Sequence, residues 1–547
     1  MLETSRIHLL QLSGSNQEMG RAHGSALKKA GTARALDYYS EFLTNVLSFQ
    51  PLHSWDRSLR RAFRWIVGET VEQAFVESVP SRYREQAVGF SEGCGVPTER
   101  ILRARVMPDV YSYLLAQRFR LFRPHGIDFL NFGCTSFAWA GSKEAEIPIL
   151  HARTLDYPGG EAWTDAPAVL EYAPPDSQRY VSVSSLGVDT AGITSMNEEG
   201  LTLSLHMNYS TRVSSRGAPV LVIGDEIMRR ARSLGQAVDI AKSFRRGAAW
   251  SFLISSLREK NAVVLESDAD SLSVRSMKDG KLVATNHFLD PALARHEYWI
   301  TPGRRMDSRA RYERMSKLLA GEGSPTIGKA VRFLRDSYDP VLNAERAFGS
   351  TISQVHTVSA VVFDPAHRTV FVAHGRPPAA KTEFKAFTCF PGPFETDAKL
   401  PAEPPGPTED GRRSYALAHD AYFPSGNLEK AETYLRAGVG LIPGDALLRF
   451  MLGLVALKRE RFGDARASLE KAMTLHETAY RKAQNRLYLA RTLDLCGERG
   501  QALDLYRSLF EDSWFKREAR RGAKKPWSLR ENRKLVLDFT IGDAVEA

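Results

Sequence analysis

Short runs of alternating apolar and polar residues fill the middle of the chain, and this pattern constrains the fold more than any other feature of the sequence. The pattern begins near Phe132 and lasts until about Arg376. Alternating segments occur at 179–185, 201–205, 262–266, 271–276 and 369–373, with helical patches at 224–244 and 308–319. A period of two is typical of strands with one buried face. The central region therefore predicts antiparallel sheets with helices packed outside them.

Regions of different composition flank these predicted sheets. At 547 residues the chain is too long for one ordinary domain. Residues 1–133 carry long helical segments, and the spacing of Gly20 and Gly24 would allow tight helix packing in one of them. The sheet-forming domain is predicted for 134–378. A Pro-rich stretch over 379–412, which includes PAEPPGPTEDG, predicts an extended linker.

Small residues recur with a helical-repeat spacing over 413–512. Ala431, Ala465 and Ala502 are 34 and 37 residues apart, and a period of 34 residues is typical of tetratricopeptide repeats. We predict three such repeats, of which the first is degenerate; a plain helical bundle is the alternative. Because a linker implies a unit with its own core, a chain that ends near Pro378 should keep its chemistry.

The final segment, 513–547, is predicted to be a basic tail. Between Lys516 and Lys534 there are nine Lys or Arg residues and two Glu residues, and the whole chain has a net charge of +10. Charge runs are usually solvated faces, and no nucleic-acid-binding motif accompanies this one, so we predict no nucleic-acid partner. No apolar run approaches the ~18 residues that span a bilayer, and the N-terminus has no secretion signal. We predict a cytoplasmic protein with no membrane partner.

The sequence offers no pattern for a bound metal or cofactor. The four cysteines, Cys94, Cys134, Cys389 and Cys496, are too scattered for a disulfide framework or a zinc site. No pair of histidines has the helical spacing of a metal site with a flanking acid, and there is no P-loop or strand-linked G-x-G-x-x-G motif. We therefore predict that the protein uses neither a metal nor an organic cofactor.

Cys134 is the candidate nucleophile. It lies between a glycine and two hydroxyl residues in the stretch NFGCTSFAWAG, at 131–141. The segment IPILHARTLDY, at 147–157, carries Arg153 and Asp156 at its end, and the two segments predict a β-hairpin. A thiol with an ordinary pKa of about 8.5 becomes a strong nucleophile beside positive charge. Arg153 would supply that charge, and Asp156 would orient Arg153.

Two stretches give the chain a resemblance to a known family. Gly133-Cys134-Thr135-Ser136 and Arg153-Thr154-Leu155-Asp156-Tyr157 resemble the penicillin acyltransferase (isopenicillin N acyltransferase) family of N-terminal-nucleophile hydrolases, which is similar to the bile salt hydrolases and penicillin V acylases. The resemblance implies an α+β chain with a four-layer αββα fold. It also implies self-cleavage between Gly133 and Cys134. The freed α-amino group of Cys134 would then be the general base, and residues 1–133 would be the smaller chain.

Further stretches match this family in chain order. Asn197-Glu198-Glu199-Gly200-Leu201 is similar to the family's Asn-Glu-x-Gly-Leu turn, and Asn208 follows it. Thr285-Asn286-His287-Phe288 matches a stretch whose asparagine helps to form the oxyanion hole. The resemblance implies that Asn286 and Asn208 hold the oxyanion. Considered alone, Asn197 and Gly200 could simply form a β-turn, and Asn286 could cap a turn.

The same resemblance places an arginine beside the nucleophile. Asp307-Ser308 is similar to the family's aspartate-serine pair, and Arg311 follows it, with Arg309 and Arg314 as rivals. Arg153 and Arg311 would then lower the pKa of the thiol, while Asp156 would contact the freed amino group. Without the resemblance, Arg311 could be one more cation on a basic helix face.

Together these residues predict a self-processing cysteine amidohydrolase or acyltransferase. Cys134 would attack the carbonyl group of a small-molecule acyl amide or thioester, and the acyl-enzyme would pass its acyl group to water or an amine. The alternative is a non-catalytic scaffold that binds a protein or peptide partner through the helical repeats. A third interpretation keeps an enzyme but pairs Cys134 with His356, without self-cleavage.

Overall fold

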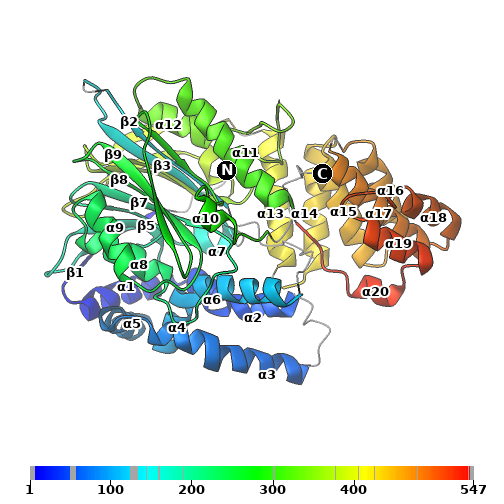
Figure 1. Ribbon diagram of the computed structural model, residues 1–547, viewed down its shortest axis with the longest axis horizontal. Coiled ribbons are helices and arrows are strands. Elements are labelled where there is room, and N and C mark those ends of the chain that lie inside the picture. Colours follow the sequence, from blue (N-terminus) through cyan, green and yellow to red (C-terminus); the bar gives the residue numbers. More distant parts are fainter. Residues whose placement is uncertain are drawn as a thin grey trace.

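The computed structural model describes residues 6–49, 57–122, 133–142, 144–157, 160–188, 190–299, 302–375, 377–404, 406–423, 425–476, 478–539 and 541. These residues form two large β-sheets, helices outside both sheets, and a helical domain at the C-terminal end (Figure 1). The predicted α+β class is confirmed.

The larger sheet has eight strands in the order β1-β4-β5-β6-β7-β8-β9-β10. These are β1 (His8–Ser13), β4 (Pro167–Ala173), β5 (Tyr180–Ser185), β6 (Thr194–Asn197), β7 (Leu201–Met207), β8 (Trp250–Ser256), β9 (Asn261–Ser267) and β10 (Leu272–Ser276). Neighbours are antiparallel except for β1 and β4, which run parallel. The antiparallel pairing predicted from the alternating pattern is thus correct for all pairs except that one.

The smaller sheet has seven strands in the order β11-β2-β3-β14-β15-β16-β17. These are β11 (Lys281–Ala284), β2 (Gly133–Ala140), β3 (Ile149–Asp156), β14 (Thr357–Asp364), β15 (Thr369–His374), β16 (Phe384–Thr388) and β17 (Phe394–Leu400). A separate two-stranded ribbon joins β12 (Tyr338–Asp339) and β13 (Ala344–Glu345). The strands β2 and β3 form the predicted hairpin, in which Cys134 lies opposite Leu155.

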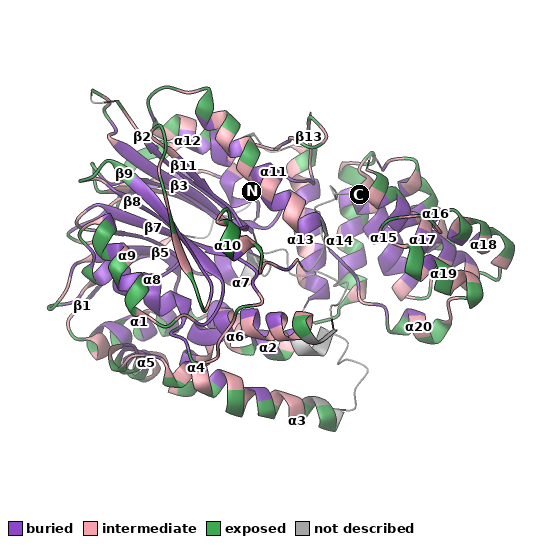
Figure 2. Ribbon diagram, viewed as in Figure 1, coloured by how far each residue is buried: buried purple, intermediate pink, exposed green. Residues whose placement is uncertain are grey.

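The two sheets stack face to face, and helices cover their outer faces. Val181 and Met196 of the larger sheet pack against Val361 and Phe387 of the smaller sheet, so the central strands are buried on both faces (Figure 2). The smaller sheet is covered by α11 (Pro302–Ala320) and α12 (Ile327–Leu334). The larger sheet is covered by α8 (Val220–Arg230) and α9 (Leu234–Ser243). Two short helices, α7 (Gly160–Thr164) and α10 (Pro291–Ala294), lie in connections.

The segment before Gly133 is not purely helical, because it begins with a strand. After β1 come α1 (Asn16–Ala30), α2 (Arg34–Phe49), α3 (Arg57–Val67), the π-helical turn η2 (Gly68–Glu72), α4 (Gln73–Glu77), α5 (Ser81–Cys94) and α6 (Thr98–Phe122). Of β1, only Leu12 is fully buried, and the prediction missed this strand although Leu10-Gln11-Leu12-Ser13 alternates apolar and polar residues. Among the described residues no helix is both long and apolar enough to cross a membrane, although α6 has 25 residues.

Glycines hold α1 and α5 in close contact. A Cβ atom on Gly20 would lie 2.1 Å from the Gln86 carbonyl oxygen, and one on Gly89 would lie 1.9 Å from the Gln17 carbonyl oxygen. Gly24 is equally tight against α5. The predicted tight helix packing at Gly20 and Gly24 is confirmed.

Replacing Gly89 with alanine should therefore force α1 and α5 apart. Overpacking of this kind costs typically about 1–3 kcal/mol, so the melting temperature should fall by several degrees. The matched control is Gly463→Ala in α16 (Phe462–Met473), where a Cβ meets nothing within 4 Å. That change should leave stability the same or raise it, since alanine favours a helix over glycine by about 1 kcal/mol. Equal melting temperatures for both variants would contradict the close contact.

The linker predicted for 379–412 is wrong over most of its length. Residues 384–388 form β16, which pairs with β15, and residues 394–400 form β17 at the sheet edge. The prediction missed β17 because the prolines around it indicate a linker, although Glu395, Asp397 and Lys399 occupy every second position of the strand. No residue of this edge strand is fully buried. The sheet domain therefore extends to about Leu400, and a chain that ends near Pro378 would lose two strands.

The C-terminal helices pair in chain order. The pairs are α13 (Pro407–Tyr422) with α14 (Leu428–Leu441), α15 (Ala446–Lys458) with α16, and α17 (Ala479–Leu495) with α18 (Arg499–Arg507). Ala431, Ala465 and Ala502 are all completely buried on the second helix of a pair. Their recurrence therefore reflects helix contacts, and the assignment to tetratricopeptide repeats stays a prediction.

The nine basic residues between Lys516 and Lys534 are all exposed, as predicted for a solvated face, but other residues of the predicted tail are buried. The tail contains α19 (Lys516–Lys524) and α20 (Leu529–Arg533). Beyond them, Leu537 and Phe539 pack into the core of the helical domain, and the Tyr415 hydroxyl of α13 donates to the Phe539 carbonyl at 2.7 Å. The described end of the chain thus returns to α13.

Candidate active site

The pairing of β2 with its two neighbours assembles the site around Cys134. On one side, β3 places Leu155 opposite Cys134. On the other side, β11 pairs Ala284 with Ser136, so the chain beyond β11 carries Asn286 to Cys134. The backbone N–H of Cys134 donates to Asn286 Oδ1 at 2.8 Å, and Cys134 is only 6% exposed. Asn286 therefore contacts the predicted nucleophile directly.

Arg153 reaches the sulfur from β3. Its Nη2 donates to Cys134 Sγ at 3.1 Å, and its Nη1 donates to the Ile193 carbonyl at 2.7 Å and to Thr194 Oγ1 at 2.8 Å. The prediction that Asp156 orients Arg153 is wrong, because Asp156 is not among the hydrogen-bond or ion-pair partners described for Arg153. Side chains three residues apart on a strand point to opposite faces. The start of β6 orients Arg153 instead.

Arg311 approaches the same residue from α11. Its Nη1 donates to the Cys134 carbonyl at 2.7 Å and to Thr135 Oγ1 at 2.9 Å, and its Nη2 donates to Asn286 Oδ1 at 3.0 Å. Asp307, one helical turn earlier, accepts from Arg311 Nε at 3.1 Å. Arg311 therefore holds the backbone and the asparagine of the site, while Arg153 contacts the sulfur.

Other predicted residues make contacts away from the sulfur. Of the rivals of Arg311, Arg314 forms an ion pair with Asp336 at 2.6 Å, and Arg309 is half-buried on the same helix. Asn208 Oδ1 accepts from Ser251 Oγ at 3.1 Å, whereas the buried Asn208 Nδ2 has no hydrogen-bond partner among the described residues. A spare donor suits an oxyanion contact, and this role of Asn208 stays a prediction.

The Asn197 turn has a structural explanation. Asn197 Oδ1 accepts from the Leu201 N–H at 3.0 Å, and Gly200 has the positive φ of +77° that such a turn requires. Asn197 Nδ2 donates to the carbonyl oxygens of Met228 and Ala231 at the end of α8. The interpretation of Asn197 and Gly200 as a β-turn between β6 and β7 is confirmed.

Asp156 ends β3 beside the predicted scissile bond. Its Oδ1 accepts from Thr357 Oγ1 at 2.7 Å. A Cβ atom on Gly133 would lie 3.1 Å from Asp156 Oδ2 and 3.3 Å from Gln354 Oε1. Burial raises the pKa of Asp156 to about 6, against the opposing effects of Arg311 and the Thr357 hydrogen bond. The carboxyl group next to Gly133 thus changes charge in the weakly acidic range.

The thiol of Cys134 is not activated in the uncut chain. Burial raises its pKa above the ordinary value, and the charges of Arg153 and Arg311 only partly offset that increase. The prediction that the two arginines produce a thiol of lowered pKa is therefore wrong for this form. Attack by Cys134 requires a base that removes the thiol proton.

The described histidines do not form a dyad with Cys134. His356 packs edge-on against His419 of α13, with ring centroids 5.0 Å apart, so the alternative pair of Cys134 and His356 is wrong. His206 lies between the sheets, where its Nε2 is 2.6 Å from Ser136 Oγ. Burial holds the pKa of both histidines well below the usual value.

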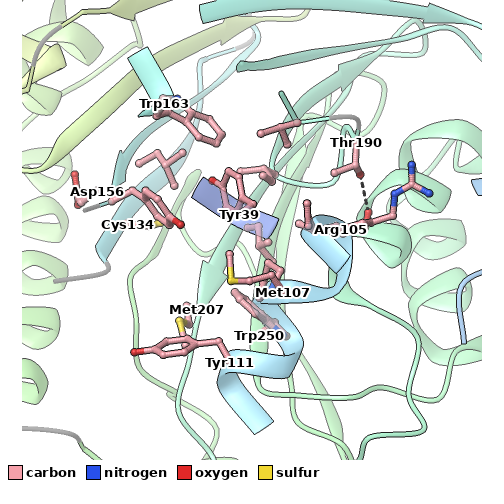
Figure 3. Close-up of a pocket in the computed structure, with 18 of the residues that line it drawn as sticks. Tyr39, Arg105, Met107, Tyr111, Cys134, Asp156, Trp163, Thr190, Met207 and Trp250 are labelled. Atoms are coloured by element: carbon pink, nitrogen blue, oxygen red, sulfur yellow. Dashed lines mark hydrogen bonds between the residues drawn. The ribbon is translucent and has the colours of Figure 1, made fainter. Parts of the chain in front are cut away.

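An apolar cavity of about 100 Å³ lies beside Cys134 (Figure 3). Gly133, Cys134, Asp156 and Asn286 contribute to its lining. Most other lining residues are apolar or aromatic, and they include Tyr39, Ala104, Met107, Pro108, Tyr111, Leu155, Trp163, Val188, Ile193, Leu205, Met207 and Trp250. Those from α2 and α6 precede Gly133 in the chain, so one wall of the cavity comes from the N-terminal segment.

Two residues at the site were not predicted. Gln354 Nε2 donates to Asp307 Oδ1 at 2.9 Å, and Thr357 donates to Asp156. Both belong to the segment Ser-Gln-Val-His-Thr at 353–357, which immediately precedes or begins β14. Short polar residues before a strand usually indicate a turn, so no sequence signal distinguishes them.

The stacked sheets and the cysteine-centred cluster define a site of the kind that acyl-transfer chemistry uses. Residues 169–379 match the family model described as acyl-coenzyme A:6-aminopenicillanic acid acyl-transferase. This match includes Asn208, Asn286 and Arg311 and begins after Cys134 and Asp156. It supports an enzyme of the acyltransferase or hydrolase type, with a likeness to the penicillin acyltransferases.

A protein of Archaeoglobus fulgidus, described as uncharacterized, is 25% identical to this chain over 344 residues. The similar region covers 57% of this chain and 54% of that protein. The chain therefore spans about half the length of this relative, whose description names no activity.

Proposed function

We propose that the protein is a self-processing cysteine amidohydrolase or acyltransferase with an N-terminal-nucleophile hydrolase fold. The observation that carries the proposal is the set of contacts on Cys134: Arg153 donates to its sulfur, Asn286 accepts from its N–H, and Arg311 donates to its carbonyl. Three separate elements thus fix the sulfur and both sides of the backbone. A structural cysteine in a hydrophobic core needs none of these contacts.

Self-cleavage would follow from attack on the preceding carbonyl group. The Cys134 sulfur adds to the Gly133 carbonyl carbon, the C–N bond breaks, and the thiol proton passes to the leaving nitrogen, which leaves a thioester. Water then hydrolyses the thioester to a Gly133 carboxylate and a free Cys134 thiol with a free α-amino group. Asp156, whose Oδ2 would lie 3.1 Å from a Cβ atom on Gly133, would assist the proton transfer.

After cleavage, the α-amino group would replace the absent base. An α-amino group has an ordinary pKa of about 7.7–8.0 and so accepts a proton near neutrality. Asn286 Oδ1, already 2.8 Å from this nitrogen, would orient it. Asn286 Nδ2 donates one proton to the Met207 carbonyl at 3.0 Å, which leaves its second proton for the oxyanion.

The cavity beside Cys134 indicates the substrate class. Its walls are mostly aromatic and aliphatic, so the acyl group that Cys134 accepts would be apolar. The acyl donor would be an amide or thioester, and the acceptor would be water or an amine. The helical repeats, in the tetratricopeptide interpretation, would bind a protein or peptide partner.

Intact mass and N-terminal sequencing of the purified protein test the proposal. From 61.0 kDa over 547 residues, a cut after Gly133 should give products of about 15 and 46 kDa, and the larger should begin with Cys134. Cys134→Ala should remain one chain, whereas Cys389→Ala, a buried cysteine remote from these contacts, should be cut normally. Wild-type protein that stays full length after prolonged incubation would favour the non-catalytic scaffold.

A further inference from the structure

The helical domain contacts the sheet domain through α13, which lies at their junction (Figure 1). Arg412 in α13 is completely buried. Its Nη2 donates to the Ser353 carbonyl, and its Nη1 donates to Ser337 Oγ at 3.2 Å. Further along α13, His419 packs on His356, and Val355 joins the core of the helical domain. One face of the 353–357 segment is therefore held by α13.

The opposite face of the 353–357 segment is directed at the candidate active site. Gln354 Nε2 donates to Asp307 Oδ1 at 2.9 Å, and Asp307 in turn accepts from Arg311 at 3.1 Å. Thr357 Oγ1 accepts from the Gln354 N–H at 3.1 Å and donates to Asp156 at 2.7 Å. The same five residues thus fix both carboxylates of the site.

Hydrogen bonds on both sides of the Ser353–Gln354 peptide bond therefore connect α13 with the nucleophile. This connection runs from Arg412 through the 353–357 segment to Asp307 and Arg311, which holds the Cys134 carbonyl at 2.7 Å. Every group along it is almost completely buried, so water offers no replacement for a lost partner.

We propose that α13 is part of the catalytic unit and that Arg412 is a positioning residue, which fixes Gln354 and Thr357 and, through them, Asp307 and Asp156. The inference rests on the proposed function for its activity readout. It replaces the expectation that the helical domain is dispensable for the chemistry. Because Arg412 touches neither Cys134 nor the cavity beside it, its effect on the reaction is indirect.

The test compares three variants of the full-length chain. Arg412→Ala should slow self-cleavage at least tenfold, and Arg412→Lys, which keeps one donor for the Ser353 carbonyl, should lie between it and the wild type. Leu469→Ala is the matched destabilised control, because Leu469 is completely buried in α16 and belongs to the core of the helical domain. Leu469→Ala should lower the melting temperature at least as much as Arg412→Ala and should cleave at the wild-type rate.

A double-mutant cycle then shows whether Arg412 acts through Gln354. Residues in one hydrogen-bond network have non-additive effects, so Arg412→Ala combined with Gln354→Ala should be no slower than the slower single variant. The proposal would be overturned if the rate loss of the double variant equals the product of the two single losses. It would also be overturned if Leu469→Ala slows self-cleavage as much as Arg412→Ala does. If Arg412→Ala does not fold, Arg412→Lys in the same cycle decides the question.

The rate at which Cys134 is alkylated tests this inference independently of the proposed function. The rate of iodoacetamide reaction at Cys134 is measured in uncut protein by peptide mapping, with the exposed Cys496 as internal reference. Arg412→Ala should raise the Cys134 rate at least threefold relative to Cys496, because the buried thiol becomes more accessible, and Leu469→Ala should not. A wild-type chain that never cleaves contradicts the proposed function alone. Unchanged alkylation in Arg412→Ala contradicts the positioning role, whether or not the chain cleaves.

Discussion

Replacement of Arg153 by lysine should slow self-cleavage and substrate turnover at least a hundredfold. Lysine keeps the positive charge, but a single ammonium group cannot contact Cys134 Sγ and at the same time span the Ile193 carbonyl and Thr194 Oγ1, as the guanidinium does. A hundredfold loss corresponds to about 2.8 kcal/mol in transition-state stabilisation, at about 1.4 kcal/mol per tenfold. Single-turnover cleavage assays and hydrolysis of a series of apolar acyl amides and thioesters would measure it.

The control for Arg153→Lys is Arg229→Lys. Arg229 is equally buried, in α8, where its Nη2 donates to Asn16 Oδ1 at 2.9 Å, so the exchange tests the general effect of a lysine in place of a buried arginine. We expect both variants to melt at a lower temperature and only Arg153→Lys to lose activity. If Arg153→Lys loses only stability, Arg153 is structural and the assignment of Cys134 as nucleophile fails with it.

The rate of self-cleavage should fall as the pH is lowered through about 6. Burial raises the pKa of Asp156 to about 6, and the carboxylate form is the one that can accept the thiol proton. The rate should therefore be maximal above this pKa and fall tenfold per pH unit well below it. In Asp156→Asn the maximal rate should drop at least a hundredfold, and this acid limb should disappear.

Deprotonation of Asp156 should affect stability in the opposite direction to the cleavage rate. Because the pKa of Asp156 is raised in the folded chain, the folded state binds this proton more tightly than the unfolded state does. Its contribution to stability is therefore present at low pH and is lost as the pH rises through about 6. Asp156→Asn should consequently melt at the same or a higher temperature than the wild type above pH 7.

Asp109 provides the control for the pH profile. Burial raises its pKa to about 7, and it accepts from the Val220 N–H and from Trp250 Nε1 at 2.9 and 3.1 Å. It therefore titrates in the same range without contact to Cys134. In Asp109→Asn the cleavage rate should still fall as the pH drops through about 6. If this fall disappears in Asp109→Asn, the group that titrates is Asp109 and not Asp156.

The sequence predicted the site better than its surroundings. The β2–β3 hairpin, with Cys134 and Arg153, was predicted from the residue pattern, whereas Asn286 and Arg311 were predicted from the resemblance to the acyltransferase family. The orientation of Arg153 was mispredicted, because it depends on the tertiary position of β6. The raised pKa of the thiol was missed for a similar reason, since burial of Cys134 is a property of the assembled fold.

The prediction of the boundary between the sheet domain and the helical domain was wrong for physical reasons. The edge strands β1 and β17 are short and mostly not buried, and the prolines around β17 indicate a linker despite its alternating sequence. Arg412 belongs to the charged stretch EDGRR, which indicates a solvated helix end, yet it is completely buried against the Ser353 carbonyl. Because Arg412 binds a backbone carbonyl far away in the chain, the residues next to it in the sequence do not indicate this contact.

The wall of the cavity formed by α2 and α6 has a consequence for how such a protein can diversify. Tyr39, Met107 and Tyr111 precede Gly133, whereas Cys134 and Arg153 follow it. A cut at Gly133 would therefore divide the lining of the cavity between two polypeptides, while Cys134 and Arg153 would belong to the larger one. Two such polypeptides can vary independently, as the subunits of a heterodimer do, provided that the pairing of β1 with β4 keeps them together. Exchange of the small polypeptide alone would then change one wall of the cavity and leave Cys134 and Arg153 the same.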